Sequence, residues 1–176
     1  MAGDLDDILT CCRAGDSHAQ RQLYERYHRT VYRLALRLGG RQEADDLTQE
    51  IFLRIFAGLD SFRGTAAFST WLYRVAVNEC LRHRRSRPQR LAPLNSEPAD
   101  PAARPDHRVE QAELLERALE RLNDHLRAVF LLREAEGLSY DQIAQALAIP
   151  PGTVASQLSR ARAELRTFLR QVEQGA

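Results

Sequence analysis

The sequence lacks a long apolar run, a secretion signal and the cysteine content of a disulfide-stabilised protein. A membrane-spanning helix needs about 20 consecutive apolar residues, and no part of the 176-residue chain provides them. The N-terminal segment Met1-Ala2-Gly3-Asp4 has neither the basic start nor the apolar centre of a signal peptide. We therefore expect a cytoplasmic protein with no membrane insertion.

The cysteines and histidines are too few and too scattered for a disulfide framework or a zinc site. Cys11 and Cys12 are adjacent and Cys80 stands alone, while the five histidines are isolated from one another. No glycine-rich loop of the kind that cradles phosphate is present, and the carboxylates fall on helix faces. The sequence predicts no catalytic residue, no metal, no cofactor and no enzyme activity.

Charge is distributed unevenly, although the net charge is only +1. All of the strong bases are arginines. Between positions 63 and 90 the only acid is Glu79, whereas seven arginines occur: Arg63, Arg74, Arg82, Arg84, Arg85, Arg87 and Arg90. The first sixty residues carry many acids. Such separation indicates one surface for an anion and another for a basic partner.

Apolar residues recur at helical spacing in two long stretches separated by a proline-rich segment. Prolines at 88, 93, 98, 101 and 105 preclude a regular helix there and are typical of an extended linker. We predict an all-α protein of two small helical domains, residues 1–86 and 108–172, joined by a linker at 87–107. Helices are expected near 4–14, 16–38, 43–58, 66–84, 108–121, 124–136, 139–147 and 152–170.

The second domain contains the pattern of a helix-turn-helix. Ser139 and Gln142 have the spacing of a capping box, and Pro150-Pro151 interrupts the chain before a second helix. In projection, that helix turns Val154, Leu158, Ala161, Leu165 and Phe168 inward and Ser156, Ser159, Arg160, Ala163 and Thr167 outward. The small outward residues would let the backbone approach DNA while Arg160 reads a guanine edge. The alternative is an ordinary helical hairpin with a solvated basic face.

Two helices of the first domain carry unusual outward faces. Trp71, Arg74, Asn78 and Arg82 share one face of the helix near 66–84, which suits unstacked bases and their phosphates. A tryptophan is, however, more often a core residue. On the helix near 43–58, Leu53 is surrounded by acids and amides, the pattern of a small protein-docking patch or of a solvated face with one stray leucine.

The ordered motifs of the chain resemble those of an extracytoplasmic-function (ECF) group sigma factor of bacterial RNA polymerase. They span both domains and read Asp45-Asp46-Leu47-Thr48-Gln49-Glu50-Ile51-Phe52-Leu53, Leu59-Asp60-Ser61-Phe62-Arg63-Gly64, Phe68-Ser69-Thr70-Trp71-Leu72-Tyr73-Arg74-Val75-Ala76-Val77-Asn78, Gly137-Leu138-Ser139-Tyr140-Asp141-Gln142-Ile143-Ala144, Pro151-Gly152-Thr153-Val154 and Ser159-Arg160-Ala161-Arg162.

The resemblance implies a transcription initiation factor that recognises promoter DNA together with core polymerase. The −10 element would be melted and read by Phe62, Arg63, Gly64, Trp71, Arg74, Asn78 and Arg82. The −35 element would be read by Thr153, Ala155, Ser156, Ser159, Arg160 and Arg162. The coiled coil of the polymerase β′ clamp would dock on Asp46, Gln49, Glu50, Leu53 and Arg54.

The same resemblance implies that the second domain contacts the polymerase β flap, that the linker threads toward the active-site cleft and RNA exit path, and that an anti-sigma partner covers both working faces. The chain departs from the family at Ala155 and Gln157, where basic residues are common, so the −35 sequence is not predictable.

The main rival hypothesis is a stand-alone helix-turn-helix regulator, which would bind duplex DNA without polymerase and leave the two faces of the first domain unexplained.

Overall fold

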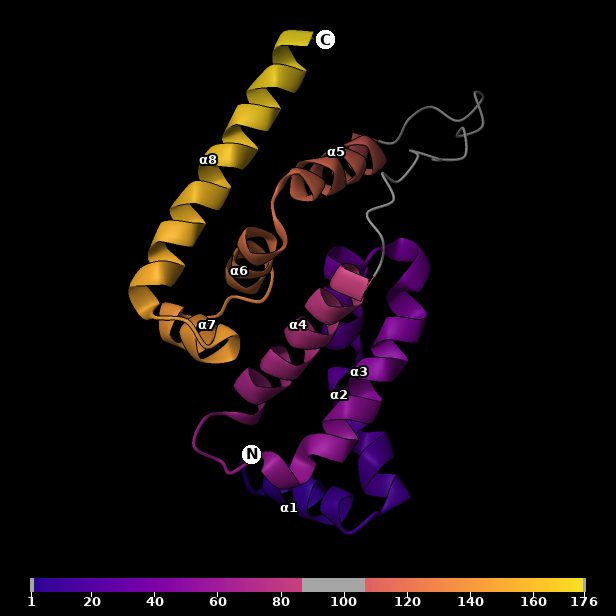
Figure 1. Ribbon diagram of the computed structural model, residues 1–176. Helices are drawn as coiled ribbons and strands as arrows, with labels where there is room; N and C mark the ends of the chain where they lie inside the picture. Colours follow the sequence, from indigo (N-terminus) through magenta and orange to yellow (C-terminus); the bar gives the residue numbers. More distant parts are fainter. Residues whose placement is uncertain (1, 87–106, 176) are drawn as a thin grey trace, which may run out of the picture.

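The computed structural model describes residues 2–86 and 107–175, and within these stretches all regular secondary structure is helical (Figure 1). The first unit contains α1 (Ala2–Arg13), α2 (Ser17–Leu34), α3 (Ala44–Gly58) and α4 (Phe68–Ser86). The second contains α5 (His107–Arg121), α6 (Asp124–Glu134), α7 (Tyr140–Leu147) and α8 (Pro151–Gly175). The predicted all-α class is confirmed, whereas nearly all of the predicted linker lies outside the described residues.

Helix ends follow from local hydrogen bonding. Asp16 caps α2 by accepting hydrogen bonds from the His18 and Ala19 amides at 2.7 and 3.3 Å. Ser139 and Gln142 form the predicted capping box: the Ser139 amide donates to Gln142 Oε1 at 2.8 Å, and the Gln142 amide donates to Ser139 Oγ at 3.2 Å. These side chains satisfy amides that the first turn of a helix leaves without a backbone partner.

A π-helical turn, η1 (Ala35–Gly39), follows α2 and lies at the centre of the first unit. It packs against α3 and α4, and Leu38 and Gly39 are buried there. Gly39 has no room for a side chain, because a Cβ at this position would collide with Leu47 of α3. The glycine therefore sets how closely α3 approaches the end of α2.

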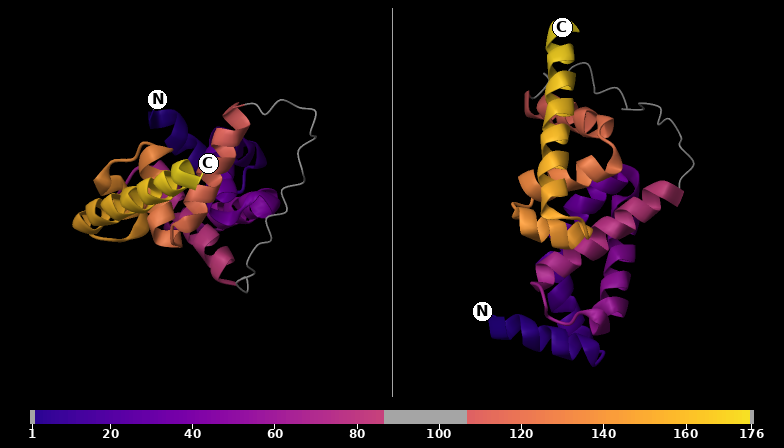
Figure 2. Two further views of the ribbon diagram at one scale, coloured as in Figure 1. Left: turned by 90° about the horizontal axis from the view of Figure 1, so that it is seen from above. Right: turned by 60° about the vertical axis from the view of Figure 1, so that its left-hand side comes forward.

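The two units are not separate bodies in this structure. One continuous cluster of buried apolar side chains includes residues of both, and α7 packs against α4 (Figures 1 and 2). Tyr73 of α4 and Arg33 of α2 bond to Glu136, which lies between α6 and α7. The residue pattern along the chain does not predict this contact. No helix in the described stretches has the length and apolar character needed to cross a membrane.

The close approach at Gly39 gives a stability prediction. Gly39→Ala should lower the free energy of unfolding by about 1–3 kcal/mol, because the new methyl group overpacks against buried Leu47. Gly152→Ala is the matched control, since Gly152 lies in α8 with open space around its Cβ position. Chemical denaturation followed by circular dichroism measures both, and equal stability of the two variants would contradict the packing described here.

Candidate functional site

An aromatic cluster supports the loop between α3 and α4. The ring of Phe62 contacts those of Phe68 and Trp71 at centroid distances of 5.3 and 5.7 Å. Trp71 is only 7% exposed. The expectation of an exposed Trp71 is therefore wrong: its ring belongs to the core, where large apolar area is buried.

The same loop is anchored from α1 by Arg13. Its Nε donates to the Leu59 carbonyl at 3.2 Å and its Nη2 to the Phe62 carbonyl at 3.0 Å. Beyond this anchor, Arg63 and Gly64 are exposed, and Gly64 has φ +71°, a left-handed conformation that favours glycine. Sequence reasoning missed Arg13, because nothing in its neighbourhood predicts a contact 46 to 49 residues away.

Three of the predicted −10 residues on α4 are exposed: Arg74, Asn78 and Arg82. Arg82 is already paired, with its Nε donating to Glu79 at 2.9 Å and its Nη2 lying 3.7 Å from Glu50 of α3. Arg54 of α3 also approaches Glu79, at 3.6 Å. The DNA-facing candidates of α4 and the docking candidates of α3 thus meet in one ionic cluster.

The predicted docking residues of α3 share an exposed face: Asp46, Gln49, Glu50, Leu53 and Arg54. Leu53 is 69% exposed, the largest fraction among the exposed large hydrophobic side chains of the described residues. A hollow of about 370 Å³ lies beside it and is lined by Glu50, Arg54, Arg82, His83 and Ser86 as well. An exposed leucine with a polar rim is the composition of a small protein-binding site.

The helix-turn-helix forms as predicted, with α7 ending at Ala148, whose φ of +53° turns the chain before α8. All five residues predicted to face inward from α8 are buried, and all five predicted to face outward are exposed. Of the six −35 candidates, Ala155, Ser156, Ser159 and Arg160 are exposed and Thr153 and Arg162 are half-buried.

Arg162 lies apart from the other −35 candidates. Its Nε and Nη2 donate to Glu134 of α6 at 3.2 and 2.6 Å, and this bond raises the pKa of the Arg162 guanidinium above its usual value. It lines a largely apolar groove of about 340 Å³ that includes Leu115 and Leu169. Arg162 therefore braces α8 on α6 at the rim of this groove.

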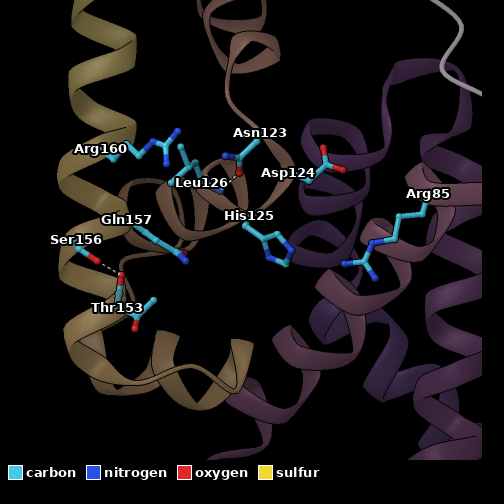
Figure 3. Close-up of a pocket in the computed structure, with 9 residues that line it drawn as sticks. All are labelled: Arg85, Asn123, Asp124, His125, Leu126, Thr153, Ser156, Gln157 and Arg160. Carbon is cyan, nitrogen blue, oxygen red and sulfur yellow. Dashed lines mark hydrogen bonds between the residues drawn. The ribbon is translucent and has the colours of Figure 1, made fainter.

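The remaining face of α8 borders a cavity of about 730 Å³ between the two units (Figure 3). The cavity is lined by Arg85 of α4, by Asn123, Asp124, His125 and Leu126 at the start of α6, and by Thr153, Ser156, Gln157 and Arg160 of α8. Sequence reasoning missed the contributions of α4 and α6, because they depend on how the units pack against each other.

Two of the three cysteines are buried. Cys11 is exposed, Cys12 and Cys80 are buried, and all three are free. Burial raises the pKa of the Cys80 thiol to about 12, so the thiolate that would act as nucleophile or metal ligand does not form at neutral pH. The described residues contain no group of three or more histidines, cysteines or carboxylates that could hold a metal ion.

Family models match both units: Sigma-70 region 2 at residues 23–89 and Sigma-70, region 4, at residues 112–165. The chain is 41% identical over 166 residues to the ECF RNA polymerase sigma factor SigM of Mycobacterium tuberculosis, covering 93% of this chain and 83% of that protein. It is 35% identical over 178 residues to the ECF RNA polymerase sigma-E factor of Escherichia coli, covering 92% and 93%.

Solved structures show the same fold. CnrH in complex with the cytosolic domain of CnrY aligns with a TM-score of 0.71 and 24% identity, covering 93% of this chain and 96% of that one. RpoE of Bartonella quintana in complex with the anti-sigma factor NepR gives 0.69 and 24%, covering 85% and 96%. With both family models and relatives above one-third identity spanning most of its length, the chain belongs to the ECF family of RNA polymerase sigma factors, which direct core polymerase to promoters.

Proposed function

We propose that this sigma factor reads the −35 element with α8, holds the opened −10 strand with α4 and the preceding loop, and docks on polymerase through α3. The observation that carries the proposal is the division of α8 into a buried apolar face and an exposed face of small residues with Arg160. Such a face lets a helix backbone come close to the major groove. No nucleotide hydrolysis is part of this function, and its place is the cytoplasm, where polymerase acts.

At the −35 element, Arg160 reads a base edge. Ser156 and Ser159 contact bases or phosphates, while Ala155 leaves room for the approach. Thr153 lies in the first turn of α8, where backbone amides attract phosphate. Arg162 contributes by holding α8 in position through Glu134.

At the −10 element, the non-template strand contacts the exposed loop and one face of α4. The loop contributes Arg63 and Gly64, and α4 contributes Arg74, Asn78 and Arg82. Trapping an extruded base offsets an unstacking cost of a few kcal/mol. Phe62 and Trp71 support this surface indirectly. Their ring contacts with Phe68 fix the loop that meets the DNA strand.

On polymerase, the exposed face of α3 binds the coiled coil of the β′ clamp through Asp46, Gln49, Glu50, Leu53 and Arg54. The second unit binds the β flap. The solved structures of CnrH and RpoE are complexes with CnrY and the anti-sigma factor NepR. We infer a comparable anti-sigma partner for this chain, covering its DNA and polymerase faces.

The docking assignment predicts a specific effect of Leu53. Leu53→Ala should weaken binding to core polymerase by about tenfold, because the truncation removes apolar contact area from the centre of a polar patch. Since Leu53 is exposed, the free protein should unfold at an unchanged temperature. Biolayer interferometry with immobilised core polymerase measures the affinity, with Gln22→Ala on α2 as the control. Unchanged affinity of Leu53→Ala would remove Leu53 from the docking surface.

The −10 assignment predicts that Arg74 acts after polymerase has bound. Arg74→Ala should reduce promoter opening by about tenfold, the loss expected for one backbone or stacking contact to single-stranded DNA, and leave the affinity for core polymerase unchanged. Permanganate reactivity of unpaired thymines reports opening, and Arg21→Ala on α2 supplies the charge-matched control. Equal losses in opening and in polymerase binding would contradict the assignment.

A further inference from the structure

Helix α1 ends beside the turn that follows α3. It packs against this turn, η3 (Leu59–Ser61), which leads into the loop before α4 (Figures 1 and 2). The end of α1 is firmly placed, because Leu9 and Cys12 are buried in the core and the Gly15 amide donates to the Cys12 carbonyl at 3.1 Å. Arg13 is the last residue of α1, so its side chain extends from a fixed backbone position.

The guanidinium of Arg13 joins both ends of the turn. As described above, it donates to the Leu59 carbonyl through Nε and to the Phe62 carbonyl through Nη2. The Leu59 carbonyl also accepts a hydrogen bond from the Phe62 amide, at 3.1 Å. A guanidinium carries its N–H donors in one rigid plane, so a single side chain can hold two carbonyls at a set separation. A lysine ammonium lacks this planar arrangement.

The bond to Phe62 also orients the next peptide. The Phe62 carbonyl and the Arg63 amide belong to one planar trans peptide, in which the two groups point in opposite directions. Because the carbonyl is directed at Arg13, the Arg63 N–H points away from the guanidinium. This N–H makes no hydrogen bond to another residue of the described stretches. Arg13 therefore fixes the direction in which the exposed loop presents the Arg63 amide.

The loop has few other restraints. Within residues 2–86 and 107–175, the hydrogen bonds that reach residues 59–67 from outside α3 and α4 all come from Arg13. The ring of Phe62 is held separately, by its contacts with Phe68 and Trp71. The aromatic contacts thus fix the side chain of Phe62, while Arg13 fixes its main chain.

We propose that Arg13 is a positioning residue for −10 recognition, which holds the Phe62–Arg63 peptide in the orientation that discriminates between bases without contacting DNA itself. The proposal rests on the −10 role given above for Arg63 and Gly64. Specific binding requires groups held within about 0.5 Å of the productive geometry. Attraction to phosphate, in contrast, carries no sequence information and depends mainly on charge. Loss of Arg13 consequently relaxes the choice of base and leaves the total attraction to DNA nearly unchanged.

Two substitutions test the proposal. Arg13→Ala removes both hydrogen bonds, and Arg13→Lys keeps the charge but lets the side chain hold only one carbonyl at a time. Each variant is combined with core polymerase and transcribes a promoter library that is randomised upstream of the start site. The preference for the favoured −10 bases should fall by about tenfold in Arg13→Ala and about threefold in Arg13→Lys, as expected for lost hydrogen bonds from a charged donor. The −35 preferences should stay at the wild-type level.

Matched controls separate positioning from charge and from stability. Arg21→Ala and Arg21→Lys on α2 change another exposed arginine and should keep the wild-type preferences at both elements. The salt dependence of holoenzyme binding to a selected promoter should have the same logarithmic slope for Arg13→Ala and the wild type. Loss of a direct phosphate contact would instead lower the slope by about one. Unchanged −35 preferences in the same reaction show that each variant is folded.

Wild-type −10 preferences in both Arg13 variants would overturn the proposal, as would equal relaxation of the −10 and −35 preferences or a reduced salt slope. Failure of the −10 assignment has a different signature. In that case Arg63→Ala and Asn78→Ala would also leave the −10 preferences unchanged, which rejects the −10 surface together with its positioning residue. If those two variants relax the −10 preferences and the Arg13 variants do not, the role of Arg13 alone is rejected.

Discussion

Helix α4 packs into the core of the first unit, contacts the second unit and exposes a third side to solvent. The arrangement of the other helices depends on these contacts. One side contributes Phe68, Trp71 and Leu72 to the core of the first unit. A second side presents Arg74 and Asn78 to solvent, while Tyr73 reaches the second unit through Glu136. Because successive residues of a helix point about 100° apart, a 19-residue helix can divide its surface in this way. Core packing, the contact with the second unit and the face proposed for promoter opening consequently share one helix.

Arginine pairing links these surfaces. Arg82 on α4 is shared between Glu79 and Glu50, and Arg54 of α3 also approaches Glu79. A polymerase surface that engages Glu50 would change the electrostatic environment of Arg82, and therefore its availability to phosphate. The net charge of +1 conceals this organisation, because Arg54, Arg82 and Arg160 each lie beside an acid.

Local patterns predicted much of the structure. Helical periodicity predicted each of the eight α-helices of the described residues and the two faces of α8, and the spacing of Ser139 and Gln142 predicted the capping box. The exposure of Leu53 was predicted for the same reason, since helix projection depends only on spacing. Contacts between distant residues were missed. Trp71 is buried because Phe62 and Phe68 close over it, and Arg13 and Glu136 act on partners 46 to 103 residues away. Spacing along the chain carries no information about these contacts.

The most direct test of the account is transcription from a promoter library by purified core polymerase, with and without this protein. The account predicts new start sites that appear only when the protein is present and that share two motifs at a constant spacing. Those motifs would be the −10 and −35 sequences that this factor recognises. The absence of new start sites, together with no binding to core polymerase, would contradict the assignment of this chain as a promoter-recognising sigma factor.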